Sequence, residues 1–124
     1  MIYDKFPEKA VEIGGIDIIG VVSEANTTAV VFSGAEVLKK YSYGMKKMQL
    51  SLQISGMSGT DEQKPLIDKM CGILQRLVSG KWEIEGVQQV KCRITNYPIP
   101  VVKNERYWIY KAGINIEFYT KEDI

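Results

Sequence analysis

The sequence predicts an α+β fold: a mainly antiparallel β-sheet of about five to six strands packed by one principal helix at about residues 61–79. Two segments, residues 45–57 and 106–119, alternate apolar and polar side chains, which is typical of half-buried strands. Between them, apolar residues recur at three- and four-residue spacing, as on an amphipathic helix. With 124 residues the chain is long enough to bury a single core, so residues 1–124 are expected to form one domain.

The first fifteen residues show no clear period. Pro7 is expected to break any early helix, and Gly14 and Gly15 to form a flexible joint. We therefore expect residues 1–15 to be a loosely held N-terminal arm. A short helical turn over residues 7–13 and an arm that packs on a partner are the alternatives.

The next two segments predict a β-hairpin. Ile16–Ser23 and Thr28–Ser33 are rich in β-branched residues, and Glu24–Thr27 between them has turn-forming side chains. Residues 35–43 are expected to be extended, to bend at Gly44 and to enter the strand at residues 45–57. In that strand the apolar side chains that share one face are Met48, Leu50, Leu52 and Ile54.

The helix predicted at residues 61–79 has an apolar stripe on one side. Pro65 fits best in the first turn, so the N-cap is expected at Asp61 or Glu62. Gly72 is expected to permit close approach to the sheet, and Gly80 to end the helix as its C′ residue. The stripe consists of Leu66, Met70, Ile73, Leu74 and Leu77.

After the helix the sequence predicts a short strand and a final antiparallel pair. Residues 81–86 alternate briefly, and residues 87–97 do so more strongly. Tyr97–Pro100 is expected to end this strand as an edge or a loop, because proline cannot donate a ladder hydrogen bond. A turn at residues 101–105, with Asn104 in the left-handed region, leads to the final strand at residues 106–119. One face of this strand carries Trp108, Tyr110, Ala112, Ile114, Ile116 and Phe118.

The composition limits the function classes. Sixteen basic and fifteen acidic residues give a net charge of +1, which argues against binding by bulk charge, such as broad coating of nucleic acid. No apolar run approaches the ~20 residues that span a bilayer, so no membrane association is expected. The first ten residues lack the apolar core of a signal peptide, which predicts that the protein begins in the cytoplasm.

No catalytic motif is present in the sequence. Histidine is absent, so this chain alone cannot form Ser-His-Asp, Cys-His or histidine metal sites. The glycine spacing is not that of a phosphate-binding loop. Glu83 and Glu85 could form a paired-acid site, but alternation on an exposed strand explains them as well. Cys71 and Cys92 are expected to be free core residues. We therefore predict no enzyme, no catalytic residue, no cofactor and no metal.

One basic segment gives an alternative function. Residues 39–47 contain four lysines and two tyrosines, a combination that could bind a phosphate backbone while the rings stack on bases. The other interpretation is a solvated hairpin corner whose lysines guard a sheet edge. A small nucleic-acid-binding module through the Lys39–Lys47 corner therefore remains the alternative.

The order of elements resembles a known family. A Tyr41-Ser-Tyr-Gly44 corner leads into Met48-Gln-Leu-Ser-Leu-Gln-Ile54, and one helix, a proline-broken strand and a long aromatic strand follow. Over about Ala29 to Tyr119, this order resembles the small minor capsid and tail-completion proteins of siphophages, which look like tail terminators. That family usually begins with a helix before its first hairpin, a feature that the pattern here does not predict.

The resemblance implies a structural virion protein at the head–tail junction, present in the host bacterial cytoplasm during assembly. It implies a homo-oligomeric ring of six copies whose partners are the tail tube and the head-completion proteins. The loops at residues 41–47 and 97–106 are the candidates for contact, since they carry the aromatic and arginine side chains enriched at interfaces. A small-ligand or enzymatic domain, in a groove between helix and sheet, is a third hypothesis. The candidate interface residues are Tyr41, Tyr43, Lys46, Lys47, Tyr97, Arg106 and Tyr107.

Overall fold

The computed structural model describes residues 2–122, which form two helices and one five-stranded sheet in the order β1-β2-β3-β5-β4. The predicted α+β class is confirmed, with 27% of residues helical and 50% in strands. β1 pairs with β2 in parallel, and all other pairs are antiparallel. The elements are α1 (Ile2–Gly14), β1 (Ile18–Ile19), β2 (Thr27–Lys40), a 3₁₀ turn (Ser42–Gly44), β3 (Lys46–Gly59), α2 (Gln63–Ser79), β4 (Val87–Lys103) and β5 (Tyr107–Thr120).

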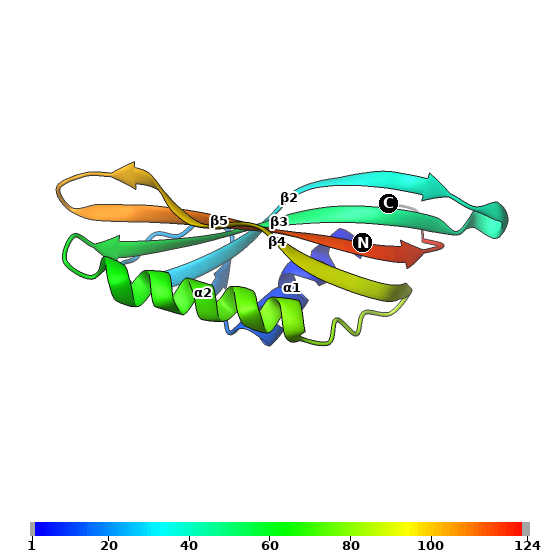
Figure 1. Cartoon of the computed structure of the whole chain (residues 1–124), viewed down its shortest axis with the longest axis horizontal. Coiled ribbons are helices and arrows are strands. Elements are labelled where there is room, and N and C mark those ends of the chain that lie inside the picture. Colours follow the sequence, from blue (N-terminus) through cyan, green and yellow to red (C-terminus); the bar gives the residue numbers. More distant parts are fainter. Residues whose placement is uncertain (1, 123–124) are drawn as a thin grey trace.

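The sheet is long, narrow and strongly twisted, so that its ribbons cross near the middle of the long axis (Figure 1). The β2–β3 turn lies at one end of this axis and the β4–β5 turn at the other. The strand register agrees, because the β3 residue Lys46 pairs with Thr120, whereas Gly59 at the other end of β3 pairs with Tyr107. The two hairpin turns are therefore separated by nearly the full length of the molecule.

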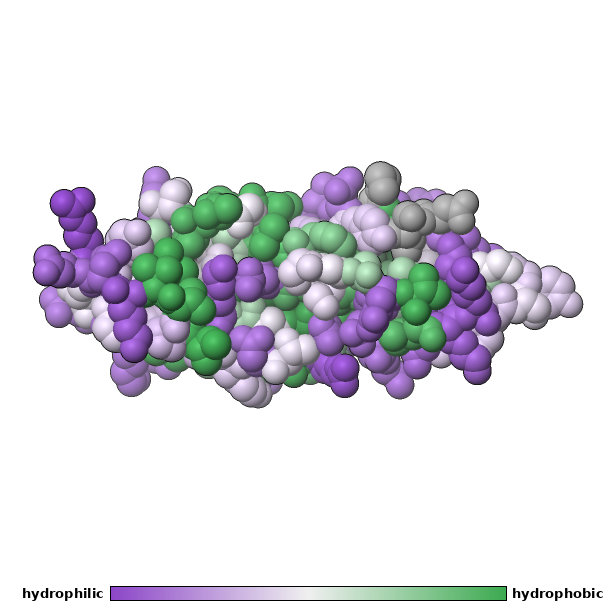
Figure 2. Space-filling model, turned by 90° about the horizontal axis from the view of Figure 1, so that it is seen from above, coloured by the Kyte–Doolittle hydropathy of each residue, from purple (hydrophilic) through white to green (hydrophobic). Residues whose placement is uncertain are grey.

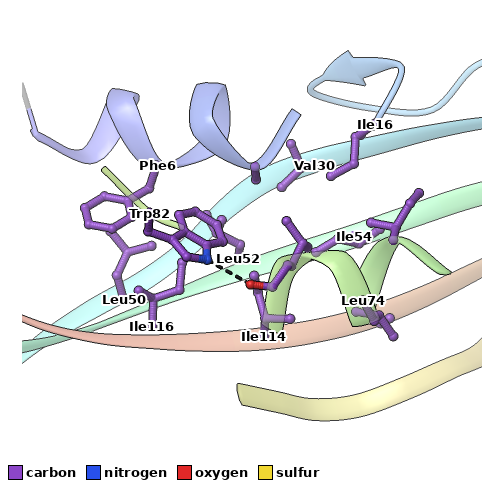
Figure 3. Packing of buried hydrophobic residues seen from close by; sticks show 14 of the residues in the cluster. Phe6, Ile16, Val30, Leu50, Leu52, Ile54, Leu74, Trp82, Ile114 and Ile116 are labelled. Carbon is purple, nitrogen blue, oxygen red and sulfur yellow. Dashed lines mark hydrogen bonds between the residues drawn. The ribbon is translucent and has the colours of Figure 1, made fainter. Parts of the chain in front are cut away.

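One face of the sheet and the two helices enclose the hydrophobic core, where alternate residues of β3 and β5 meet the apolar side of α2 (Figure 3). The stripe predicted for α2 is confirmed, since all five of its residues are at most 2% exposed. The predicted inner faces of β3 and β5 are also confirmed, apart from Trp108 at the margin, which is half-buried. The buried residues of these two strands on that face are Met48, Leu50, Leu52, Ile54, Tyr110, Ala112, Ile114, Ile116 and Phe118.

The prediction of a loose N-terminal arm is wrong, because α1 is a packed helix that continues through Pro7. The Phe6 ring is fully buried, with its centroid 4.7 Å from that of Phe118 and 6.2 Å from that of Trp82. Burial of an aromatic ring stabilises by a few kcal/mol, which offsets the hydrogen bond that proline removes. The buried positions of α1 are Ile2, Phe6, Pro7, Ala10 and Gly14.

The predicted first hairpin is also wrong. β1 has two residues and pairs with Ala29 and Val30 in parallel, not antiparallel. Gly20, at φ 127°, then turns the chain while its N–H donates to the Val30 carbonyl oxygen. This turn allows Val22 to pass around the sheet edge and to pack on the face opposite the helices.

The glycine roles differ from those predicted. A Cβ on Gly72 would meet only Arg76, whereas a Cβ on Gly56 of β3 would lie 2.8 Å from Leu66 Cδ1 and 2.9 Å from Met70 Sδ. The close approach of helix and sheet thus depends on a glycine of the strand. Gly80 follows α2 with φ −74°, so it is not a left-handed C′ residue.

Three expectations for residues 80–105 need correction. β4 does not end at Tyr97–Pro100 but continues to Lys103, although its predicted edge position is confirmed. Residues 81–86 form no strand, and Trp82 is instead buried, with its Nε1–H donating to the carbonyl oxygen of Leu77 at 2.8 Å (Figure 3). Asn104 has no positive φ; its Oδ1 accepts hydrogen bonds from the backbone N–H groups of Arg106 and Tyr107, which closes the turn.

Candidate interaction surfaces

The sheet face opposite the helices is covered by Val22 and by no other buried apolar side chain from outside the sheet among residues 2–122. Its centre is polar, with Ser51 Oγ donating to Asn115 Oδ1 at 2.8 Å across β3 and β5. Gly113 of β5 has no side chain there, and a Cβ would lie 2.6 Å from both Thr95 Oγ1 and Asn96 Oδ1. In the middle of the molecule this open face is therefore polar across β3, β5 and β4, while Val31 of β2, which pairs with Gln53, is 38% exposed beside it.

At the end of the molecule that holds the β4–β5 turn, the open face is apolar. Met57 of β3 pairs with Ile109 of β5, which pairs with Val102 of β4, so the three side chains form a line across three strands. Val22 covers the β2 side of this line, where Ala29 is fully buried. We call Val22, Ala29, Met57, Ile109, Val102 and Ile99 the apolar row.

The β4 side of the apolar row has no such cover. Val102 is 39% exposed and Ile99 is 53% exposed, and the half-buried Tyr107 and Ile109 lie beside them. Figure 2 shows hydrophobic surface near the end that holds the β4–β5 turn, with hydrophilic residues around it. The apolar row is thus exposed to solvent on its β4 side and covered on its β2 side.

The opposite end of the molecule carries the lysine hairpin, which we define as residues 39–47. The Tyr41 ring lies 6.0 Å from the ring of Tyr119, measured between centroids. Lys39 Nζ lies 5.1 Å from the Tyr41 ring centre, and Lys47 Nζ lies 5.9 Å from that of Tyr119. These two distances are within the range of cation–π contacts, and both contacts lie at the base of the hairpin.

Tyr43 occupies the turn of the lysine hairpin in an unusual state. Its φ is 65°, in the left-handed region, and its side chain is 91% exposed. A residue with a Cβ loses roughly 1–2 kcal/mol in that region, and an exposed ring gains no burial in return. Figure 2 shows this turn as a narrow projection at one end of the molecule.

The structure does not bring the predicted interface residues together. Tyr41, Tyr43, Lys46 and Lys47 belong to the lysine hairpin, where Lys46 Nζ also donates to the Glu122 carbonyl oxygen at 3.0 Å. At the other end, Arg106 is exposed in the β4–β5 turn and Tyr107 lies beside the apolar row. Tyr97 is 56% exposed and lies near the middle of the sheet, since its neighbour Asn96 pairs with Gly113. Sequence reasoning missed the apolar row itself, because its members come from separate strands.

Other candidate chemistry finds little support. A groove between the end of α2 and β4 is lined in part by Val78, Trp82 and Cys92, but burial raises the pKa of the Cys92 thiol to about 12, so it offers no thiolate near neutral pH. Glu83 and Glu85 are exposed on either side of buried Ile84. Among residues 2–122 no three Cys, Asp or Glu side chains are grouped as a metal site requires.

No family model and no curated protein matches this sequence. No helix within the described part of the chain is long and apolar enough to cross a membrane.

Proposed function

We propose that this chain is a structural virion protein of the phage head–tail junction, similar to a tail terminator or minor capsid protein. It acts by forming a homo-oligomeric ring that docks onto the tail tube and the head-completion proteins. The observation that carries the proposal is the position of two different exposed surfaces, the lysine hairpin and the apolar row, at opposite ends of one elongated subunit.

Two different surfaces on one subunit favour a head-to-tail contact. Such a heterologous contact repeats from copy to copy, and it produces a ring when the rotation closes. Because the strands of 14 to 17 residues hold the surfaces far apart, they cannot meet within one copy. Exposed tyrosine and apolar side chains are suited to the centre of such an interface.

The presence of α1 supports the resemblance to the siphophage family. The siphophage tail-completion proteins usually begin with a helix, and here Ile2–Gly14 forms one that packs on the core. The remaining order, from the β2–β3 corner through α2 to the β4–β5 pair, follows the pattern of that family. The virion is the location that this function implies, with the host bacterial cytoplasm as the place of assembly.

The alternative of a nucleic-acid-binding module has less support. Lys39 and Lys47 lie over tyrosine rings of their own chain, and Lys47 Nζ also lies 3.9 Å from a Glu117 carboxylate oxygen. These contacts compete with phosphate for the same ammonium groups. Steeply salt-dependent DNA binding, lost on changing Lys46 and Lys47 to Gln, would instead favour this alternative.

Disruption of the gene in the phage that carries it tests the proposal. We expect DNA-filled heads and separate tail tubes in electron micrographs, because the ring that joins them is missing. Supplying the unaltered gene from a plasmid is the control and should restore tailed particles. Normal tailed particles in the absence of the gene would contradict the proposed function.

A further inference from the structure

We propose that Tyr43 of one copy packs on the uncovered side of the apolar row of a second copy, a contact that rests on the proposed function and names the surfaces by which copies join. The projecting side is the turn of the lysine hairpin. The receiving side is formed by Ile99 and Val102 of β4, with Tyr107 and Ile109 of β5 beside them.

Tyr43 is unfavourably placed in the isolated chain. A bulky aromatic residue is both strained at φ 65° and 91% exposed, so neither its backbone nor its ring stabilises the isolated chain. Gly44, at φ 77°, follows it in the same turn. The turn therefore projects a tyrosine into solvent, and tyrosine is one of the residues that most often dominate binding energy at interfaces.

The receiving surface is an apolar cluster that its own chain covers only in part. Within one chain Val22 covers Ala29 and Met57, and their cluster ends at the half-buried Ile109 and Tyr107. Ile99 and Val102 extend the same face and stay 53% and 39% exposed. A ring placed there would complete the cover that Val22 begins. Ile109 pairs with Met57 near one end of β3, whereas Tyr43 precedes Lys46 at the other end. The tyrosine therefore has to come from another copy.

The two ends of the molecule carry opposite charge. The lysine hairpin carries Lys39, Lys40, Lys46 and Lys47 around Tyr43. The turns at the receiving end carry four exposed carboxylates against two cations, Lys103 and Arg106, and Lys103 Nζ lies over the ring of Trp108, 5.0 Å from the ring centre. Opposite charge at the two ends favours a head-to-tail encounter over like ends meeting. The four carboxylates are those of Glu24, Asp61, Glu62 and Glu105.

The substitution Tyr43→Asn tests the contact in the full-length protein. Asparagine tolerates the left-handed region better than tyrosine, so the variant should melt at the same or a higher temperature than the wild type. Its self-association, measured by sedimentation equilibrium, should nevertheless weaken about tenfold or more. Val78→Asn, which also removes an exposed apolar side chain, is the matched control and should associate like the wild type.

A mixing experiment tests the direction of the contact. Ile99→Ser removes the receiving side, so each single variant should stay mostly monomeric. In an equimolar mixture, Tyr43 of an Ile99→Ser chain can still bind the intact apolar row of a Tyr43→Asn chain. The mixture should therefore give dimers but nothing larger. A mixture of folded variants that remains monomeric, undiminished association of Tyr43→Asn, or a wild-type monomer at about 1 mM would each overturn the contact.

The two proposals fail in different ways. If the gene disruption leaves heads and tubes unjoined, but a Tyr43→Asn gene restores tailed particles fully, the contact is wrong and the proposed function stands. If tailed particles form without the gene, the proposed function is wrong whatever the sedimentation shows.

Discussion

Arg76 of α2 donates hydrogen bonds from both Nε and Nη2 to the carbonyl oxygen of Gly14, at 3.1 and 2.7 Å. This carbonyl ends α1, so one side chain ties the C-terminal ends of the two helices together. Arg76→Ala should lower the free energy of unfolding by roughly 1.5–3 kcal/mol, because it leaves a partly buried carbonyl without its charged partner. Arg76→Lys should recover only part of this loss, since an ammonium lacks the guanidinium fork. Urea unfolding measures both; equal stability of Arg76→Ala and wild type would contradict the role of this pair.

Phe6 tests whether α1 belongs to the core. Its ring is fully buried between Phe118 and Trp82, so Phe6→Ala should lower the free energy of unfolding by about 3–5 kcal/mol. The neighbouring exposed residue provides the control, and Lys5→Ala should change stability by less than ~0.5 kcal/mol. If the two variants denature at the same urea concentration, α1 is not a part of the cooperative core.

Gly56 tests the close contact between α2 and β3. A Cβ there would lie 2.8 Å from Leu66 Cδ1, so Gly56→Ala should be overpacked and lose about 1–3 kcal/mol of stability. The added cost should shrink in a Met70→Ala background, where the second close atom is removed. Gly34→Ala is the control, because nothing lies within 4 Å of its Cβ position; thermal unfolding should show it unchanged or slightly more stable.

Asp17 gives a pH dependence of known sign. The hydrogen bond from Lys69 Nζ, at 2.9 Å, is the main cause that lowers the pKa of this carboxyl below its ordinary 3.8, and hydrogen bonds from Thr28 add to it. A lowered folded-state pKa stabilises the fold above pH 3.8, and this contribution is lost as the pH falls through the folded-state pKa.

The corresponding experiment compares Asp17→Asn with wild type. The difference in unfolding free energy should be largest at neutral pH and should shrink as the pH drops below 3.8. Both partners are more than a third exposed, so solvent screening keeps the effect modest. Asp68→Asn removes a carboxylate from the more exposed Lys64 pair and is the control; a difference for Asp17→Asn that grows in acid would have the wrong sign.

The regular elements of the fold were predictable because each buries one face. In β3, β5 and α2 the apolar residues recur with the period of the element itself, so the inner residues could be identified one segment at a time. α1 was missed because Pro7 masks the four-residue spacing of Ile2, Phe6 and Ala10.

Features that depend on several segments were not predictable. The direction of β1 follows from the path of the chain around Gly20, not from its β-branched composition. β4 tolerates Pro98 and Pro100 because an edge strand has ladder partners on only one side. The exposed aromatic residues of the turns were found from composition, but the apolar row requires the register that places Met57, Ile109 and Val102 in line.

The sheet order also has a consequence for synthesis. β5 is the final strand of the sheet in sequence but lies between β3 and β4. Asn115 of β5 and its partner Ser51 of β3 are 64 residues apart in sequence. While the ribosome is still making residues 107–120, β3 has an unpaired edge and the inner side of α2 lacks part of its apolar partner surface. Pairing over such a distance is slow, so this edge stays open to incorrect pairing until residues 107–120 have been made and have filled the gap in the sheet.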